Sequence, residues 1–266
     1  MKGTVEYYES EKIFHGHIPF VMGTRLDLVT VGQEREMMED VWSQISLASG
    51  MIDGMLNRFD RNSEVSRLNA AASICNQGIS GELSAILELC EDYKQRTEGL
   101  FDIACGEMDK IHLDAESGLS LCGATLDFGG FAKGYFLKQC RDIFERQQVQ
   151  NLFLDFGDSS IMALGHHPHG DCWKVSVMNS FTRLPLAELE LRNQTLSTSG
   201  NTPSYSGHIV NPQTGEHNTD RKMVTVISGD PLDAEVLSTV LMIASEQQRE
   251  NISKSFPGTE YRIYNL

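Results

Sequence analysis

Four stretches of the chain show the apolar spacing and the end signals that are typical of amphipathic helices. In the longest, from Glu34 to about Leu56, apolar residues repeat every three or four positions. The same spacing predicts helices from Gly81 to Arg96 and from about Phe131 to Arg146. A fourth helix is expected to begin at Asp230, because this acid can cap the backbone and Pro231 suits the first helical position.

Short β-prone runs bounded by turn residues dominate the C-terminal half, and one loosely alternating run precedes them. The predicted strands are Arg25–Val31, Leu152–Phe156, Trp173–Met178, Leu186–Leu191, Met223–Ser228 and Tyr261–Leu266. Because helices and strands do not alternate in a strict βαβ rhythm, the sequence predicts an α+β fold. Residues 13–266 are expected to form one domain, preceded by an N-terminal extension over residues 1–12.

Composition and charge narrow the possible ligands. The 266 residues are 40% hydrophobic and 22% charged, as in ordinary globular proteins, and the formal net charge is −15. This charge argues against nonspecific binding to nucleic acid or anionic membranes, so an anionic ligand needs a local metal ion or cluster of backbone donors. The chain has neither a long apolar run nor a signal-peptide core, and its six cysteines are dispersed. As written, it is therefore expected to be cytoplasmic, without a transmembrane segment.

The segment from Leu126 to Tyr135 carries the clearest chemical signal. A short apolar run ends in Gly129 and Gly130, and Lys133 follows at the start of a predicted helix. Paired glycines let the backbone approach a bulky anion, and the first helical turn offers unpaired N–H groups and the positive end of the dipole. Lys133 adds a charge of the kind that binds phosphate. The segment predicts a phosphate site, although its spacing matches neither a Walker A motif nor a dinucleotide fingerprint.

Seven short motifs follow one another along the chain. They are Met22–Thr24, Ser63–Asn69, Gly99–Ile103, Asp127–Tyr135, Thr198–Asn201, His208–Gly215 and Glu235–Thr239. Their order resembles the ApbE family, the FAD:protein FMN transferases once described as thiamine-biosynthesis lipoproteins. The resemblance extends from about Phe20 to Ala244. Each motif is weak alone, but the order of all seven is specific.

The resemblance implies a concrete activity. Members of the family bind FAD with a divalent metal, usually Mg²⁺, at the pyrophosphate. They transfer the FMN half to a threonine or serine hydroxyl of an acceptor protein and release AMP, and some members hydrolyse FAD to FMN and AMP instead. The fold implied is α+β, with antiparallel sheets, packed helices and an FAD cleft between two sub-parts.

The resemblance also implies a metal site. In the family, an aspartate and a threonine four residues apart on one helix bind the metal together with a main-chain carbonyl from the glycine-lysine motif. Glu235 and Thr239 have this spacing, which places both side chains on one helical face. Ala132 would supply the carbonyl. Asp233 is the rival carboxylate, but it lies six residues before Thr239 and is expected to point away from that face.

The remaining site residues are likewise carried over from the family. Lys133 is expected to bind the phosphates, and His208 is the candidate for orienting or deprotonating the acceptor hydroxyl. The residues expected to line the FAD cleft are Met22, Thr24, Asp102, Gly129, Gly130, Thr198, Ser199 and Gly200.

Several positions depart from the family pattern. Glu235 replaces the usual aspartate, Asn211 and Gln213 replace an acid and an arginine, and Asp158 stands where a second glycine is usual. The lipoprotein cysteine is also missing, whereas family habit would favour the cell envelope. Three functions therefore stay open: FMN transfer to protein, FAD pyrophosphatase activity, and FAD binding with weak catalysis.

Two other features have plain structural interpretations. His166, His167 and His169 resemble a metal cluster, but Pro168 and neighbouring glycines indicate a loop. Trp173, which opens a predicted strand, is expected to pack in the core.

Overall fold

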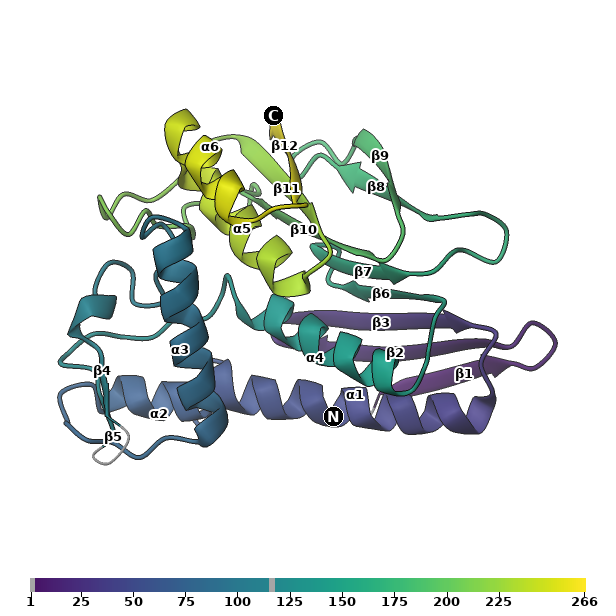
Figure 1. Ribbon diagram of the computed structural model, residues 1–266, viewed down its shortest axis with the longest axis horizontal. Coiled ribbons are helices and arrows are strands. Elements are labelled where there is room, and N and C mark those ends of the chain that lie inside the picture. The colour runs from purple at the N-terminus through teal and green to yellow at the C-terminus, as the bar shows by residue number, and fades with distance from the viewer. Residues whose placement is uncertain (1–2, 115–117) are drawn as a thin grey trace.

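The computed structural model describes residues 3–114 and 118–266 and is built around an eight-stranded antiparallel sheet (Figure 1). In space, the strands lie in the order β1-β2-β3-β6-β7-β10-β11-β12. Their bounds are β1 Thr4–Tyr8, β2 Ile13–Val21, β3 Thr24–Val31, β6 Leu152–Phe156, β7 Ser160–Leu164, β10 Gln194–Gly200, β11 Lys222–Ser228 and β12 Glu260–Asn265. The predicted α+β class is therefore confirmed.

Three helices cover one face of this sheet: α1 (Arg35–Leu56), α4 (Ala132–Arg146) and α5 (Pro231–Ile243) (Figure 1). Helix α4 packs against both α1 and α5, and α5 packs on β10 and β11. The helices and the sheet enclose the main core, in which large side chains such as Phe136 and Phe156 are fully buried. In the part of the chain that the structure describes, no helix is both long and apolar enough to cross a membrane.

Shorter elements stand at one end of this layer. They are α2 (Glu64–Ala70), α3 (Gly81–Arg96), a 3₁₀ turn at Met108–Lys110, and the strand pair β4 (His112–Asp114) and β5 (Gly118–Ser120). Helix α6 (Glu246–Ser255) follows α5 and lies above α3 in Figure 1.

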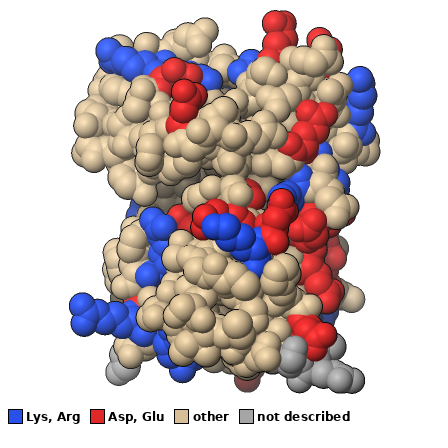
Figure 2. Space-filling model, turned by 90° about the vertical axis from the view of Figure 1, so that its left-hand side faces the viewer, with Lys and Arg blue, Asp and Glu red and all other residues tan. Residues whose placement is uncertain are grey.

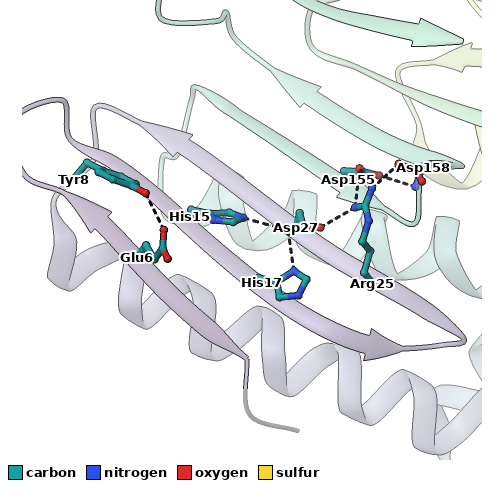
Figure 3. Close-up of polar contacts among 8 residues, drawn as sticks. All are labelled: Glu6, Tyr8, His15, His17, Arg25, Asp27, Asp155 and Asp158. Atoms are coloured by element: carbon teal, nitrogen blue, oxygen red, sulfur yellow. Dashed lines mark hydrogen bonds and ion pairs between the residues drawn. The ribbon is translucent and has the colours of Figure 1, made fainter. Parts of the chain in front are cut away.

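The opposite face of the sheet carries a second layer, centred on its C-terminal strands. There the hairpin of β8 (Trp173–Met178) and β9 (Pro185–Leu191) packs on the sheet and forms a second, smaller core. Trp173 is buried in this core, as predicted. Over β2, β3 and β6, the same face instead carries the polar network drawn in Figure 3.

This network is centred on the Asp27 carboxylate. One oxygen of Asp27 lies 3.2 Å from His15 Nε2 and 2.9 Å from His17 Nδ1, and Arg25 donates to the other at 2.7 Å. Burial alone would raise the pKa of Asp27, but the hydrogen bonds from the two histidines and Arg25 outweigh it and lower that pKa. Arg25 also donates to Asp155 at 2.9 Å, so it links β3 to β6.

The predicted elements form close to their predicted bounds. Each predicted helix starts within one residue of its expected position, and the predicted strands agree equally well. Sequence reasoning missed β1, β2, β4, β5, β7, β10, α2 and α6. Strand β1 lies inside the segment predicted as an N-terminal extension, and it pairs with β2 at the edge of the sheet.

Candidate functional site

Two glycines at the start of α4 let this helix lie close to α5. A Cβ atom added to Gly130 would stand 3.1 Å from Thr239 Oγ1, and one added to Gly134 would stand only 2.5 Å from the Cβ of Glu235. Any larger residue at Gly134 would therefore push the two helices apart. The glycine-lysine motif thus brings the first turns of α4 against the α5 face that carries Glu235 and Thr239.

The turn before α4 is held by an aspartate. Gly129 donates its backbone N–H to Asp127 Oδ1 at 2.9 Å, and Arg58 lies 3.0 Å from the other carboxylate oxygen. This Asx-type turn orients the backbone that leads into the helix. Gly129 and Gly130 are therefore placed at the start of α4, where the predicted phosphate site requires them.

Lys133 points from the first turn of α4 toward the sheet. Its ammonium donates to Ser159 Oγ at 2.7 Å and to Ser160 Oγ at 2.9 Å. It also lies 3.1 Å from Glu235 Oε1. Ser159 lies in the β6–β7 turn and Ser160 opens β7, whereas Glu235 belongs to α5. Lys133 therefore joins α4 to the start of β7 and to α5, which are distant in sequence.

Glu235 is only 4% exposed, which is unusual for a carboxylate. Its Oε2 accepts hydrogen bonds from Ser160 Oγ at 2.7 Å and from Ser197 Oγ at 2.8 Å. Its Oε1 faces Lys133. A buried charge is tolerated only when it is paired and hydrogen-bonded, and Glu235 meets both conditions.

Hydroxyl groups continue from Glu235 along α5 and β10. Ser199 Oγ lies 2.8 Å from Ser238 Oγ and 3.2 Å from Thr239 Oγ1. We call Ser159, Ser160, Ser197, Ser199, Ser238 and Thr239 the hydroxyl cluster. The structure therefore brings Lys133, Glu235, Thr239 and Ser199 together, as the sequence predicts.

The neighbours of Ser199 have different surroundings. The Thr198 backbone N–H donates to the Ser159 carbonyl at 2.7 Å, which ties β10 to the β6–β7 turn. A Cβ on Gly200 would stand 2.7 Å from Met223 Cγ, so this glycine is required by the close approach of β11.

The donor atoms at this site fit a hard divalent cation. Carboxylate, hydroxyl and carbonyl oxygens are the ligands that Mg²⁺ prefers, and the face of α5 that packs on the start of α4 carries the buried Glu235 carboxylate and, one turn later, Thr239. Residues 3–114 and 118–266 contain no group of three His, Cys, Asp or Glu side chains arranged for a metal. His166, His167 and His169 accordingly lie in a loop, as predicted.

Asp233 points away from this cluster, as its position on α5 predicts. Its Oδ1 accepts a 2.6 Å hydrogen bond from the Tyr93 hydroxyl and lies 3.9 Å from Arg96. Burial raises the pKa of Asp233, and the hydrogen bond from Tyr93 only partly opposes this shift. The rival carboxylate therefore belongs to the contact between α5 and α3.

His208 lies in the segment between β10 and β11 and contacts none of the residues around Glu235. Its imidazole stacks on the ring of Tyr205, with 4.2 Å between centroids and 21° between planes. Partial burial lowers the pKa of His208. Asn211, where the family has an acid, accepts the Gln213 backbone N–H at 2.9 Å and so shapes its own turn.

The remaining predicted cleft residues lie on two separate segments. Met22 has a positive φ of 46° in the β2–β3 turn, and Thr24 opens β3. A Cβ on Gly157 would stand 2.2 Å from Thr24 Oγ1, so the β2–β3 and β6–β7 turns touch. Asp102 is largely buried: it accepts the Ala104 N–H at 2.7 Å and lies 3.8 Å from Lys94.

Sequence reasoning missed the serines of the site. Ser160 and Ser197 bind Glu235, but each is an ordinary strand residue whose role depends on pairing between β7 and β10. It also passed over Phe59, a residue that is 79% exposed and whose ring centroid lies 4.8 Å from the Arg58 guanidinium. A lone aromatic residue among polar ones, just before the Ser63 motif, was the available signal for it.

The end of the molecule that carries α2 and α3 is hollowed. Figure 2 shows a recess between the upper and lower halves of this face, with both acidic and basic side chains around it. This recess agrees with the expected cleft between two sub-parts.

Comparison with known proteins places these features in context. The sequence model described as "ApbE family" matches residues 22–118 and 107–263. A FAD:protein FMN transferase from Klebsiella pneumoniae (strain 342) is 30% identical over 152 residues, which are 50% of this chain and 46% of that protein. One from Salmonella typhimurium (strain LT2) is 20% identical, covering 87% of this chain and 79% of the relative.

Solved structures share the fold. The ApbE protein from Thermotoga maritima superposes with a TM-score of 0.80 at 18% identity, covering 94% of each chain. The flavin transferase ApbE from Vibrio cholerae gives a TM-score of 0.77 at 17% identity, covering 99% of this chain and 97% of the other.

Proposed function

Because the chain belongs to the ApbE family, we propose that it transfers the FMN half of FAD to a threonine or serine hydroxyl of an acceptor protein and releases AMP. The observation that carries this proposal is the buried pair of Lys133 and Glu235 at the glycine-tight start of α4. In a chain of net charge −15, such a local device is what an anionic pyrophosphate requires.

The first turn of α4 is suited to the pyrophosphate of FAD. The helix dipole favours negative charge there, and Gly129 and Gly130 leave the backbone accessible. Lys133 contributes a positive charge from the same turn. Met22, Thr24, Asp102, Thr198, Ser199 and Gly200 complete the proposed cleft.

The flavin ring needs a flat apolar partner. The exposed ring of Phe59 is available for this role, because Arg58 connects it to the Asp127 turn before α4. Stacking on an aromatic face would position the isoalloxazine without a specific hydrogen bond.

Glu235, Thr239 and the carbonyl of Ala132 would hold Mg²⁺. When bound, the ion supplies charge neutralisation at the pyrophosphate, which is the main requirement of phosphoryl transfer. Glutamate can ligate this ion as aspartate does, although its side chain is one methylene longer. The hydrogen bonds from Ser160 and Ser197 hold Glu235 Oε2, so the orientation of the carboxylate is already set.

His208 is proposed to accept the proton of the acceptor hydroxyl. The hydroxyl oxygen attacks the phosphorus of the FMN half, the bond from that phosphorus to the bridging oxygen breaks, and AMP leaves with this oxygen. The proton passes to an imidazole nitrogen of His208. Because partial burial lowers the pKa of His208, the ring is neutral at pH 7 and can accept it.

The proposal is tested by incubating the purified protein with FAD and Mg²⁺, with and without a threonine-bearing acceptor protein. Covalent flavin fluorescence on the acceptor, with one AMP released per flavin, is the expected result. Free FMN and AMP without labelled acceptor would assign the pyrophosphatase activity instead. Unchanged FAD would leave only a binding role, and equilibrium dialysis without preference for FAD over FMN or ATP would exclude that role too.

A further inference from the structure

We propose that Lys133 is the resident counter-ion of Glu235 in the metal-free protein, and that it competes with the divalent cation for this carboxylate until FAD draws the lysine away. This inference rests on the proposed function, because it concerns the same metal and pyrophosphate site. It makes Lys133 a coupling element between metal binding and FAD binding, in addition to its role as a phosphate-binding residue.

Lys133 is held by two serines and by Glu235. Its ammonium donates hydrogen bonds to Ser159 Oγ at 2.7 Å and to Ser160 Oγ at 2.9 Å, and it forms an ion pair with Glu235, 3.1 Å from Oε1. A phosphate oxygen that binds this ammonium therefore competes with three neighbouring oxygens for it.

The two oxygens of Glu235 are not equivalent. Oε2 is held by hydrogen bonds from Ser160 and Ser197, whereas Oε1 has Lys133 as its neighbour. A cation binding at the carboxylate would therefore use Oε1, the oxygen that the ammonium faces. Two cations beside one oxygen repel each other, so the metal and Lys133 disfavour each other's binding there.

The competition is strong because the site is buried. Glu235 is almost inaccessible, and the side chain of Lys133 is only 22% exposed, so water screens their charges little. Without a cation, Glu235 would be an unpaired buried charge, and the lysine removes this penalty. A pyrophosphate at the start of α4 offers Lys133 new anionic acceptors, which frees Glu235 Oε1.

The competition links the binding of the metal to the binding of FAD thermodynamically. If FAD draws Lys133 away from Glu235, FAD must raise the affinity for the metal, and the metal must raise the affinity for FAD by the same factor. Lys133→Gln removes the competing charge but keeps a polar side chain. It should therefore raise the affinity of the FAD-free protein for the metal by about tenfold, within the usual range of coupling between sites.

The test titrates Mn²⁺ into the FAD-free protein and detects free Mn²⁺ by electron paramagnetic resonance. Lys138→Gln is the matched control: it removes the same charge from the same helix, but Lys138 pairs with Asp230 rather than Glu235. We expect tighter Mn²⁺ binding in Lys133→Gln and parental binding in Lys138→Gln. Equal or weaker Mn²⁺ binding in Lys133→Gln would overturn the proposal.

Three further measurements guard against misfolding and separate the inference from the proposed function. Ser159→Ala keeps both charges and removes one acceptor of Lys133, so it should strengthen Mn²⁺ binding by a smaller factor. Adding FAD should tighten Mn²⁺ binding in the parent but much less in Lys133→Gln, and equal tightening would contradict the coupling. If Glu235→Gln binds Mn²⁺ like the parent, the metal site of the proposed function fails. If instead the parent protein transfers FMN but Lys133→Gln binds Mn²⁺ with unchanged affinity, the inference alone fails.

Discussion

Helix α5 carries two carboxylates away from bulk solvent, the buried Glu235 and the partly buried Asp233. They have the same kinds of neighbour, but these neighbours are arranged differently. Each lies beside a cation and accepts a hydrogen bond from a hydroxyl group. Glu235 faces the hydroxyl cluster. Asp233 faces what we call the aromatic cluster, which consists of Tyr93, Arg96, Phe101 and Phe256.

The aromatic cluster is a packed structural contact. The Tyr93 ring stacks on Phe256 with 6.0 Å between centroids and meets Phe101 edge-on at the same separation. The Arg96 guanidinium lies 3.9 Å from the Phe256 ring centroid. The two groups that contact Asp233, the Tyr93 hydroxyl and Arg96, both belong to α3 and are packed against these rings, so the contacts of Asp233 serve to join α3 to α5.

The hydroxyl cluster is built from small side chains beside a glycine-rich helix start. Its residues sit on separate elements, and Lys133, which donates to Ser159 and Ser160, is a flexible side chain that can reach other acceptors. The comparison teaches that a buried carboxylate with a cation is not in itself a sign of function. What distinguishes Glu235 is that its cation can be exchanged.

The largest expected effect comes from Glu235→Gln. This change keeps the size and an oxygen for the serines but removes the charge that would hold the metal. FAD cleavage should fall by about ten-thousandfold or more, to background, which corresponds to several kcal/mol of lost transition-state stabilisation. The measurement is AMP release at saturating FAD. Asp233→Asn is the matched control, and equal losses in both variants would refute the assignment of Glu235.

The next effect concerns His208, which lies outside both clusters. His208→Ala should slow FMN transfer by about a hundredfold to ten-thousandfold, as expected for a positioned base, while FAD binding persists. Because the pKa of His208 is lowered, the apparent pKa on the acid side of the parent's kcat/KM profile should lie below the ordinary histidine value of 6.5. A variant that transfers FMN at the parental rate would show that the histidine only supports the turn on which Tyr205 lies.

The helices and strands that the sequence predicted are those whose ends or apolar spacing are visible within a few residues. Helix α5 starts where Asp230 and Pro231 indicate, and the Asp230 side chain accepts the Leu232 N–H at 2.8 Å. Strand β10, with the sequence QTLSTSG, was missed because Leu196 is its only large apolar residue, so no apolar–polar alternation marks it. Its stability comes from pairing with β7 and β11, which are distant in sequence. Signals within a few residues were readable, and long-range pairing was not.

The same distinction applies to the site. The four-residue spacing of Glu235 and Thr239 predicts a shared face, and Gly130 and Gly134 do pack against these two residues. The support from Ser160 and Ser197 could not be predicted, because β7 and β10 bring these serines together only in the folded sheet. The pairing of Lys133 with Glu235 likewise depends on the packing of α4 on α5.

Tyr93→Phe tests whether the aromatic cluster has a purely structural role. It keeps the packing of the ring but removes the hydroxyl that donates to Asp233, which leaves a buried carboxylate without this donor. The free energy of unfolding should fall by about 1–3 kcal/mol, measured by urea denaturation. Mn²⁺ affinity and FAD cleavage should stay at parental values. A loss of metal binding in Tyr93→Phe would mean that the aromatic cluster supports the metal site after all.

The smallest expected effect is a change in the pH dependence of stability on substituting Asp233. Burial raises the pKa of Asp233 in the folded protein above its ordinary value of 3.8, which we take for the unfolded chain. At a pH between the unfolded and the folded pKa, the folded protein therefore binds more protons at this position than the unfolded chain does. Stability contributed by this group is therefore full below the unfolded pKa and declines as the pH rises through the folded pKa. Asp233→Asn has no such proton, and its amide oxygen can still accept from Tyr93. The difference in unfolding free energy, variant minus parent, should thus increase from pH 3.5 toward neutrality and then level off. Urea denaturation of both proteins across this range measures it, and a difference that stays constant with pH would show that Asp233 titrates alike in the folded and unfolded chains.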